Sequence, residues 1–339
     1  MPLNPSKCLF FSILILGTLI SISANSWFGI WMGLEINLLS FIPLMSTPQN
    51  MLSSEASLKY FLVQALASSI LLFATILLHI NNPIMYMNPN IIITFISLSL
   101  LLKMGAAPLH FWFPGTMEGL NWLNCFILMT WQKIGPLILL SYTFPFSSFL
   151  MPFTISCIII GSIGGLNQTS LRKLLAYSSI NHLGWMLVAL ITGENMWMTY
   201  FMIYTFLNLS IVYMFNTFQM FHINQSFLML SSNPVIKFML FSLLLSLGGL
   251  PPFLGFLPKW LVIQNMMNNQ LPFLATIMVI MTLVTLFYYM RLTFSSFLLS
   301  YMELKWNTKN NFNYTSFLPL MTMFFISSTS LLICMMIFI

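Results

Sequence analysis

Two segments with the same spacing of glycine and proline decide the fold of this chain: LLLKMGAAPLHFWFP (100–114) and LSLGGLPPFLGFLPKW (245–260). In each segment a G-x-x-P tetrad is followed by a second proline six residues after the first. Proline lacks a backbone N–H and clashes with the preceding helical turn, so it breaks a helix. Broken backbone at membrane depth is tolerated only against protein or a water-filled cavity. The segments therefore predict two broken helices near mid-membrane, at 105–108 and 248–252.

The same spacing reveals an internal repeat of 144 residues, which is the difference between Gly249 and Gly105. This offset carries five apolar stretches of the first half onto five of the second, the last pair only approximately. Two halves with an odd number of spans cross a membrane in opposite directions, as in the inverted repeats of secondary transporters. We predict repeats at 1–145 and 146–299, each with one broken helix, and a loop with a last helix in 300–339.

The composition of the 339 residues is that of a membrane protein. Apolar residues make up 59% of the chain and charged residues 5%, with a mean hydropathy of +0.92, whereas a soluble domain carries about 25% charged residues. Because a spanning helix needs about 20 apolar residues, the chain divides into about eleven spans. They lie at 6–24, 27–45, 57–79, 90–108, 120–142, 149–167, 172–191, 196–221, 235–265, 272–298 and 316–339. The predicted fold class is an all-α polytopic membrane protein without a soluble catalytic domain.

The lysine and arginine residues outside the apolar stretches fall on one side of the predicted membrane. Short loops that are rich in these residues stay on the cytoplasmic or matrix side of a membrane. Eight of the 11 basic residues fall toward the side that holds the N-terminus. They are Lys7, Lys59, Arg172, Lys173, Lys237, Arg291, Lys305 and Lys309. Eleven spans would then place the C-terminus on the opposite side.

Three lysines and one glutamate remain inside apolar sequence: Lys103, Lys133, Lys259 and Glu35. A charge near the bilayer centre costs roughly 2.5 to 3.5 kcal/mol, so such groups are functional candidates. Snorkelling or a structural pairing explains one such residue more readily than four. Burial favours the neutral form of a lysine and a nearby carboxylate favours the charged form, so a movable carboxylate can switch a lysine's charge. We predict that Glu35 pairs with Lys103 and that Lys133 and Lys259 continue a proton path through water.

Two histidines are candidates to extend this path, because an imidazole titrates near neutral pH. His182 lies midway through an apolar span, and His110 follows the first break. The offset of 144 maps Glu35 onto Ser179 and Lys103 onto Leu247, so the scaffold is doubled but the charges are not. The two halves should therefore play different parts in one path.

Other chemistries lack their sequence motifs. No G-x-G-x-x-G follows a strand and no G-x-x-x-x-G-K-[ST] is present, so we expect no dinucleotide or ATP binding. The four cysteines are too far apart for the C-x-x-C spacing of zinc or redox sites. The basic residues are too dispersed for nucleic acid. We expect no metal and no cofactor in this chain.

Six strings are similar to sequences of the antiporter-like membrane subunits of respiratory complex I, in an animal mitochondrial version. They are MGLEINLLSFIPL (32–44), SSEASLKYFLVQALASSILLF (53–73), LLLKMGAAPLHFWFP (100–114), MTWQKIGPL (129–137), GGLNQTSLRKLLAYSSINHLGW (164–185) and LSLGGLPPFLGFLPKW (245–260). By this resemblance, Glu35 and Lys103 match the glutamate–lysine pair of the family. Lys133 matches its connecting lysine, and Lys259 matches the lysine at its second broken helix.

The resemblance also implies a function. The family forms part of the proton-translocating NADH:ubiquinone reductase and pumps protons across the mitochondrial inner membrane, with no redox site in the antiporter-like subunits. Flavin, iron–sulfur clusters and the quinone site would belong to partner subunits, and the partners would include sibling antiporter-like subunits. Bacterial relatives have further N-terminal helices, which this chain lacks.

Two other functions remain open from the sequence. A stand-alone cation/proton antiporter would need a cation site of carboxylates and carbonyls, and one buried glutamate with no aspartate in the chain argues against sodium. A structural spacer that does not pump would keep the same charges for assembly alone. Co-purification with a large NADH-oxidising assembly would separate complex I from the antiporter.

The one-sided distribution of lysine and arginine predicts the orientation of the chain. The N-terminus and the loops that hold Lys59 and Arg172 should face the mitochondrial matrix, and the C-terminus should face the intermembrane space. Protease accessibility of terminal tags in mitoplasts measures this directly. A C-terminal tag that stays protected in intact mitoplasts would contradict the orientation.

Overall fold

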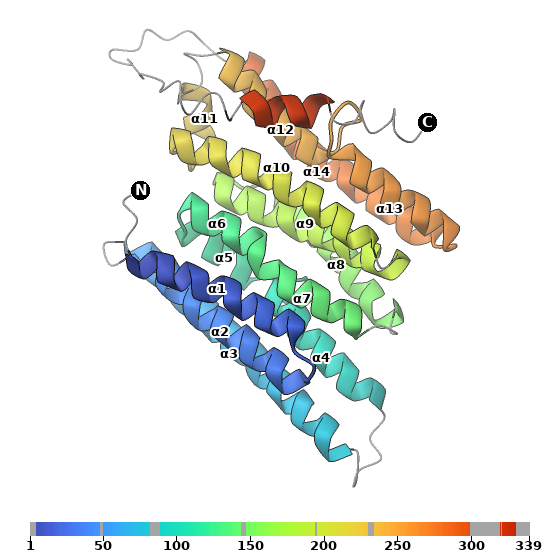
Figure 1. The fold of residues 1–339 in the computed structure, drawn as a ribbon. Coiled ribbons are helices and arrows are strands. Elements are labelled where there is room, and N and C mark those ends of the chain that lie inside the picture. The colour runs from blue at the N-terminus through green and yellow to red at the C-terminus, as the bar shows by residue number, and fades with distance from the viewer. Residues whose placement is uncertain are drawn as a thin grey trace. The chain divides into compact units, whose positions relative to one another are not determined.

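The computed structural model describes residues 5–47, 50–81, 89–143, 147–193, 195–229, 234–298, 319 and 321–329. In this part of the chain all named elements are helices, and the only β pairing is one isolated bridge between Ser170 and His222 (Figure 1). Seven of the helices are long and apolar enough to cross a membrane by length and composition. The prediction of an all-α polytopic membrane protein is therefore confirmed.

The chain forms two compact units, Met1–Phe153 and Thr154–Ile339. The helices that begin in the first unit are α1 (Pro5–Ser23), α2 (Trp27–Met45), α3 (Met51–Asn81), α4 (Pro89–Met104), α5 (Trp112–Gly119), α6 (Trp122–Met129), α7 (Trp131–Tyr142) and α8 (Ser147–Gly164). Helices α1, α2 and α3 lie side by side, and α4 packs against α3 and α7 (Figure 1). The boundary falls inside α8, close to the predicted limits at 145 and 146, which stay predictions.

The second unit holds the remainder of α8 and six further helices. These are α9 (Leu171–Thr192), α10 (Met196–Phe218), α11 (Ile223–Met229), α12 (Pro234–Gly248), α13 (Phe256–Asn268) and α14 (Pro272–Leu298). Helix α9 is the central element of this unit, because most of its side chains are buried and it packs against α10, α13 and α14.

The predicted spans from 6–24 to 272–298 all overlap these helices, but two of the spans are divided. The span at 235–265 forms α12 and α13, and the span at 120–142 forms α6 and α7, which meet at Thr130. The total of eleven stays a prediction, because most of the last range, 316–339, lies outside the described residues. The predicted loop with Lys305 and Lys309 lies outside them as well.

Both predicted helix breaks are present, and they obey the offset of 144 residues. Helix α4 ends at Met104 and α12 ends at Gly248, 144 positions later. The next residues, Gly105 and Gly249, have positive φ angles of 73° and 86°, which favour glycine. The following helices begin at Trp112 and Phe256, again 144 positions apart.

The repeat extends to the contact between the first two helices of each half. A Cβ atom added to Gly17 of α1 would lie 3.0 Å from the backbone nitrogen of Asn37 in α2. A Cβ atom on Gly161 of α8 would lie 2.6 Å from the backbone nitrogen of Asn181 in α9. Both partners are offset by 144 residues, so the same close glycine contact recurs in both halves. Small residues permit such close helix packing in membranes.

A second position in these helix pairs exchanges a small residue for a large one. In the first half, Gly33 of α2 faces Ser21 of α1, and an added Cβ would lie 2.6 Å from the Ser21 nitrogen. Its counterpart in α9 is Tyr177, whose ring fills the space that Gly164 of α8 leaves open. The glycine of this contact therefore lies on the second helix of the pair in the first half and on the first helix in the second half.

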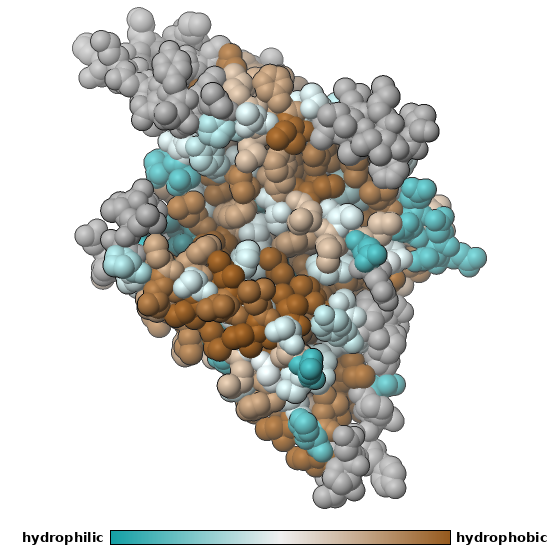
Figure 2. Space-filling view, in the orientation of Figure 1, coloured by the Kyte–Doolittle hydropathy of each residue, from teal (hydrophilic) through white to brown (hydrophobic). Residues whose placement is uncertain are grey.

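The outer surface of the helices is apolar. Exposed side chains of α1 include Leu9, Leu16 and Leu19, each more than half exposed, and the surface over α1 is brown in Figure 2. A soluble protein rarely exposes a large contiguous apolar surface. The lipid bilayer is the solvent that this surface fits.

The glycine contact between α8 and α9 yields a test of the packing. Gly161→Ala should destabilise the protein by about 1–3 kcal/mol, because the new methyl group meets backbone atoms that cannot move aside. Gly115→Ala in α5 is the matched control, since a Cβ there meets no atom within 4 Å. Thermal unfolding in detergent measures both variants. Equal unfolding temperatures would show that α8 and α9 are not in close contact.

Candidate functional site

The first break places a lysine at the end of an apolar helix. Lys103 lies in the last turn of α4. The backbone turns at Gly105, where an added Cβ would lie 3.2 Å from Phe113 Cβ. The carbonyl of Lys103 lacks a helical partner, as expected at a helix C-terminus. It instead accepts a hydrogen bond of 3.1 Å from Nε2 of Gln64, a buried residue of α3.

Lys103 and Glu35 lie near each other but do not form a closed ion pair. The Lys103 side chain is 8% exposed, and Glu35 is half-buried in α2. Glu35 lies within electrostatic range of Lys103. Among the described residues, no nitrogen–oxygen distance of 4.0 Å or less joins the two side chains. The predicted pair is therefore brought into range without a direct contact.

Lys133 lies beside the helix that follows the first break. It belongs to α7 and is 1% exposed, and its Nζ is 5.2 Å from the centre of the Phe113 ring in α5. A cation at this distance is attracted by the face of an aromatic ring. The structure thus brings Lys133 close to the break that carries Lys103.

A neutral polar chain next to Lys133 reaches the helix that carries Glu35. Gln132 donates from Nε2 to Asn37 Oδ1 at 3.1 Å, and its Oε1 lies 3.5 Å from the hydroxyl of Tyr60. Asn37 is two residues from Glu35 in α2. Side-chain hydrogen bonds of Gln132 therefore join α7 to α2 and to α3.

His110 is held at the first break itself. Its Nδ1 is 3.1 Å from the carbonyl oxygen of Pro108, and its ring packs against Phe111 with the ring centres 4.5 Å apart. The side chain is buried. These contacts fix the imidazole within the non-helical segment between α4 and α5.

The second break is held by its own lysine. Lys259 in α13 is buried and turns back toward α12, where its Nζ donates to the carbonyl of Gly248 at 2.8 Å. The carbonyl of Leu247 lies 3.5 Å from the same Nζ. The positive φ angle of Gly249 favours glycine, and a Cβ there would lie 2.9 Å from this nitrogen, so a larger residue would displace the lysine end.

His182 lies in a group of aromatic residues in the second unit. Its Nδ1 is 2.8 Å from the hydroxyl of Tyr200, and its ring centre is 5.1 Å from that of Tyr204. Sequence reasoning missed both tyrosines of α10. The signal was available, since two tyrosines four residues apart on one face of an apolar helix present their hydroxyls to the same neighbour.

The candidate residues fall into two groups that the structure describes separately. Glu35, Lys103, Lys133 and His110 belong to the unit Met1–Phe153, and His182 and Lys259 belong to the unit Thr154–Ile339. A continuous path that joins the two groups stays a prediction. Within the described residues, no three His, Cys, Asp or Glu side chains are grouped so that they could hold a metal ion.

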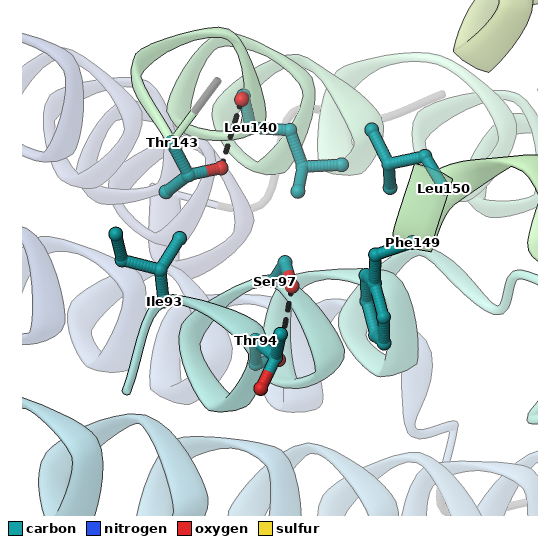
Figure 3. Close-up of a pocket in the computed structure, with 7 residues that line it drawn as sticks. All are labelled: Ile93, Thr94, Ser97, Leu140, Thr143, Phe149 and Leu150. Carbon is teal, nitrogen blue, oxygen red and sulfur yellow. Dashed lines mark hydrogen bonds between the residues drawn. The ribbon is translucent and has the colours of Figure 1, made fainter. Parts of the chain in front are cut away.

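A small cavity with a mainly apolar lining lies between α4, α7 and the start of α8 (Figure 3). It is lined by Ile93, Thr94, Ser97, Leu140, Thr143, Phe149 and Leu150. The hydroxyls of Thr94, Ser97 and Thr143 each donate to a carbonyl three residues earlier, which leaves their oxygens as acceptors. The volume of about 10 Å³ is near the minimum for one water molecule. The cavity lies at least six residues along α4 from Lys103 and at least seven residues along α7 from Lys133.

Lys237 is one of the basic residues that are predicted to lie toward the side of the N-terminus, and this orientation stays a prediction. The structure adds that Lys237 is buried near the start of α12. Its Nζ donates to the carbonyl of Ser296 at the end of α14 and faces the ring of Phe297. A position near a helix end is compatible with both a solvated and a buried lysine, and only the packing separates them.

Known proteins share the sequence and the fold of this chain. The family model described as NADH:quinone oxidoreductase/Mrp antiporter, TM, matches residues 24–285. The protein named NADH-ubiquinone oxidoreductase chain 2 is 59% identical in Anopheles gambiae over 91% of both chains, and 56% identical in Aedes aegypti over 98% of both. A chain of respiratory complex I from Thermus thermophilus matches with a TM-score of 0.86 at 21% identity, over 97% of this chain and 78% of that chain.

The curated relatives extend over nearly the whole length of this chain at more than half identity, and the family model covers its central part. The structural match adds that the fold is shared with a more distant membrane protein. The chain therefore belongs to the NADH-ubiquinone oxidoreductase chain 2 family.

Proposed function

We propose that this chain is a membrane subunit of respiratory complex I that translocates protons while partner subunits carry electrons from NADH to ubiquinone. The observation that carries the proposal is the position of Lys103. It is a buried lysine at a helix break, within range of Glu35 but without a direct ion pair. A cation that is neither solvated nor fully neutralised is costly in a membrane, which favours a functional reason for its presence.

The first unit contains the parts of a proton switch. When Glu35 is near, its charge stabilises the ammonium form of Lys103, and when Glu35 moves away this stabilisation is lost. Lys133, buried beside Phe113, can accept this proton once it has passed its own proton on and its amine is neutral.

The second unit contains groups that accept and return protons. The imidazole of His182 shares a hydrogen bond with Tyr200, and such a pair exchanges donor and acceptor roles without moving the chain. Lys259 lies at the second break and completes the set of buried lysines. In this proposal the direction of transfer runs from Lys103 through Lys133 and His182 to Lys259.

The proposed surroundings follow from the family. The chain is a multi-pass protein of the inner mitochondrial membrane, and its partners are other membrane subunits of complex I. We propose that the N-terminus faces the matrix and the C-terminus the intermembrane space, in agreement with the basic loops. Flavin, iron–sulfur clusters and quinone would be bound by partner subunits, and this chain would hold no cofactor.

A non-pumping spacer is the main alternative. It would need the same fold and the same assembly partners, but no change in the charge of Lys103 during turnover. A stand-alone cation/proton antiporter is a weaker alternative, because its cation site would require several carboxylates, and Glu35 is the one acid inside the predicted spans. The proton-to-electron ratio of an assembled complex distinguishes a pumping subunit from a structural spacer.

Removal of the charge at Lys103 tests the pumping proposal. Lys103→Met should lower the number of protons pumped per NADH oxidised, because the methionine fills the space but carries no proton. Lys59→Met is the matched control, since Lys59 is half exposed and pairs with Glu55 at 2.6 Å on the surface, where ion pairs contribute about 0–1 kcal/mol. An unchanged proton-to-electron ratio at a normal rate in the assembled Lys103→Met complex would favour the spacer.

Removal of one hydroxyl tests the part played by His182. Tyr200→Phe should slow coupled proton transfer by roughly fivefold, the equivalent of one buried hydrogen bond of about 1 kcal/mol, while the ring packing is kept. Tyr142→Phe is the control, because Tyr142 is exposed at the end of α7. The rate of proton uptake in reconstituted vesicles measures the effect. Equal rates in both variants would remove the Tyr200 hydroxyl from the path.

A further inference from the structure

The last carbonyl groups of α4 and α12 are equivalent, but different side chains cap them. In α4 the carbonyl of Lys103 accepts from Nε2 of Gln64 at 3.1 Å. In α12 the equivalent carbonyl, 144 residues later, is that of Leu247, which lies 3.5 Å from Nζ of Lys259. The neighbouring carbonyl of Gly248 accepts from the same Nζ at 2.8 Å.

Each half has the side chain for one kind of cap and lacks the other. The position equivalent to Gln64 is Asn208, which is one methylene shorter, and among the described residues its Nδ2 makes no hydrogen bond to the carbonyl of Leu247. The position equivalent to Lys259 is Gly115, which has no side chain. The first half therefore has an amide cap and no amine cap, and the second half has an amine cap and no amide cap.

The surroundings of Lys259 show why its cap matters. Helix α13 packs against α9, α10 and α14, and the sequences of these helices and of α12 contain no aspartate or glutamate. Their titratable groups are His182, Tyr177, Tyr200, Tyr204, Tyr213, Tyr288, Tyr289, Arg172, Lys173, Lys237 and Arg291. The charge of Lys259 is thus stabilised by helix-end carbonyl dipoles, which favour cations, whereas Lys103 has Glu35.

We propose that Gln64 and Lys259 are equivalent positioning residues, each of which holds the helix end at one break. This proposal rests on the proposed function for Lys259 as a proton carrier and adds a second role. The first break is held by a neutral amide and is indifferent to the proton on Lys103. The second break is held by the proton carrier itself, and charge-assisted hydrogen bonds are roughly twice as strong as neutral ones. Departure of the proton from Lys259 therefore loosens the end of α12.

Hydrogen exchange in the purified complex tests the two caps locally. Gln64→Leu should raise amide exchange at 105–111 by at least about tenfold, the effect of losing a buried hydrogen bond and leaving a carbonyl unpaired, without affecting 249–255. Lys259→Met should do the reverse. Lys103→Met is the matched control, because it removes a lysine but leaves the Gln64 cap on its carbonyl. Unchanged exchange at the expected segment in either cap variant would overturn the proposal.

Two further variants separate the cap from the carrier. Lys259→Arg keeps a donor for Leu247 and Gly248 but releases no proton at neutral pH, so 249–255 should stay protected while pumping is lost. This variant remains informative if Lys259→Met fails to assemble. Lys259→Met combined with Asn208→Gln should regain protection of 249–255, because the amide cap is transplanted, but should not regain pumping.

The two readouts keep the proposals apart. Both proposals are supported if 249–255 is protected from exchange in every variant that keeps a donor for the α12 carbonyls, and if pumping occurs only when Lys259 is present. Normal pumping in Lys259→Arg would contradict the proton-carrier function and leave the cap intact. An exposed 249–255 segment in both Lys259→Arg and the double variant would overturn the cap and leave the pumping function untouched.

Discussion

The organisation of this protein depends on the need of backbone carbonyl groups for hydrogen-bond donors inside a membrane. A helix that ends in water has its last carbonyls solvated, but one that ends between apolar helices needs donors from other parts of the chain. Helices α4 and α12 both end in this way, at Met104 and Gly248. Gln64 supplies the donor at the first of these ends and Lys259 at the second.

The second unit extends this solution beyond the breaks. Three basic side chains donate to carbonyls at or near the C-termini of other helices: Lys259 to Leu247 and Gly248, Lys237 to Ser296, and Arg291 to Leu166 at 2.7 Å. Each contact satisfies a carbonyl and places a cation at the negative end of a helix dipole. The chain has a net charge of +6 with five acids, and helix ends supply part of the compensation that carboxylates would otherwise provide.

The sequence predicted the features that have a strong local cause. Proline and glycine spacing predicted both breaks, and the length of apolar runs predicted the helices. The insertion cost of charge identified Lys103, Lys133 and Lys259. Neutral polar residues such as Gln64 and Tyr200 escaped notice, because they carry little insertion cost and acquire their roles only from a partner distant in sequence. The missing direct contact between Glu35 and Lys103 depends on side-chain positions that spacing does not determine.

The exchange of caps between the halves also affects how the chain is made. A protein is synthesised from its N-terminus, and early segments begin to fold before later ones exist. Gln64 precedes the carbonyl that it caps by 39 residues, so the end of α4 has its donor as soon as it is synthesised. Lys259 follows its two carbonyls by 12 and 11 residues. The end of α12 therefore has no donor from Lys259 until α13 has been synthesised. A nascent chain that ends between Gly248 and Lys259 would leave these carbonyls uncapped.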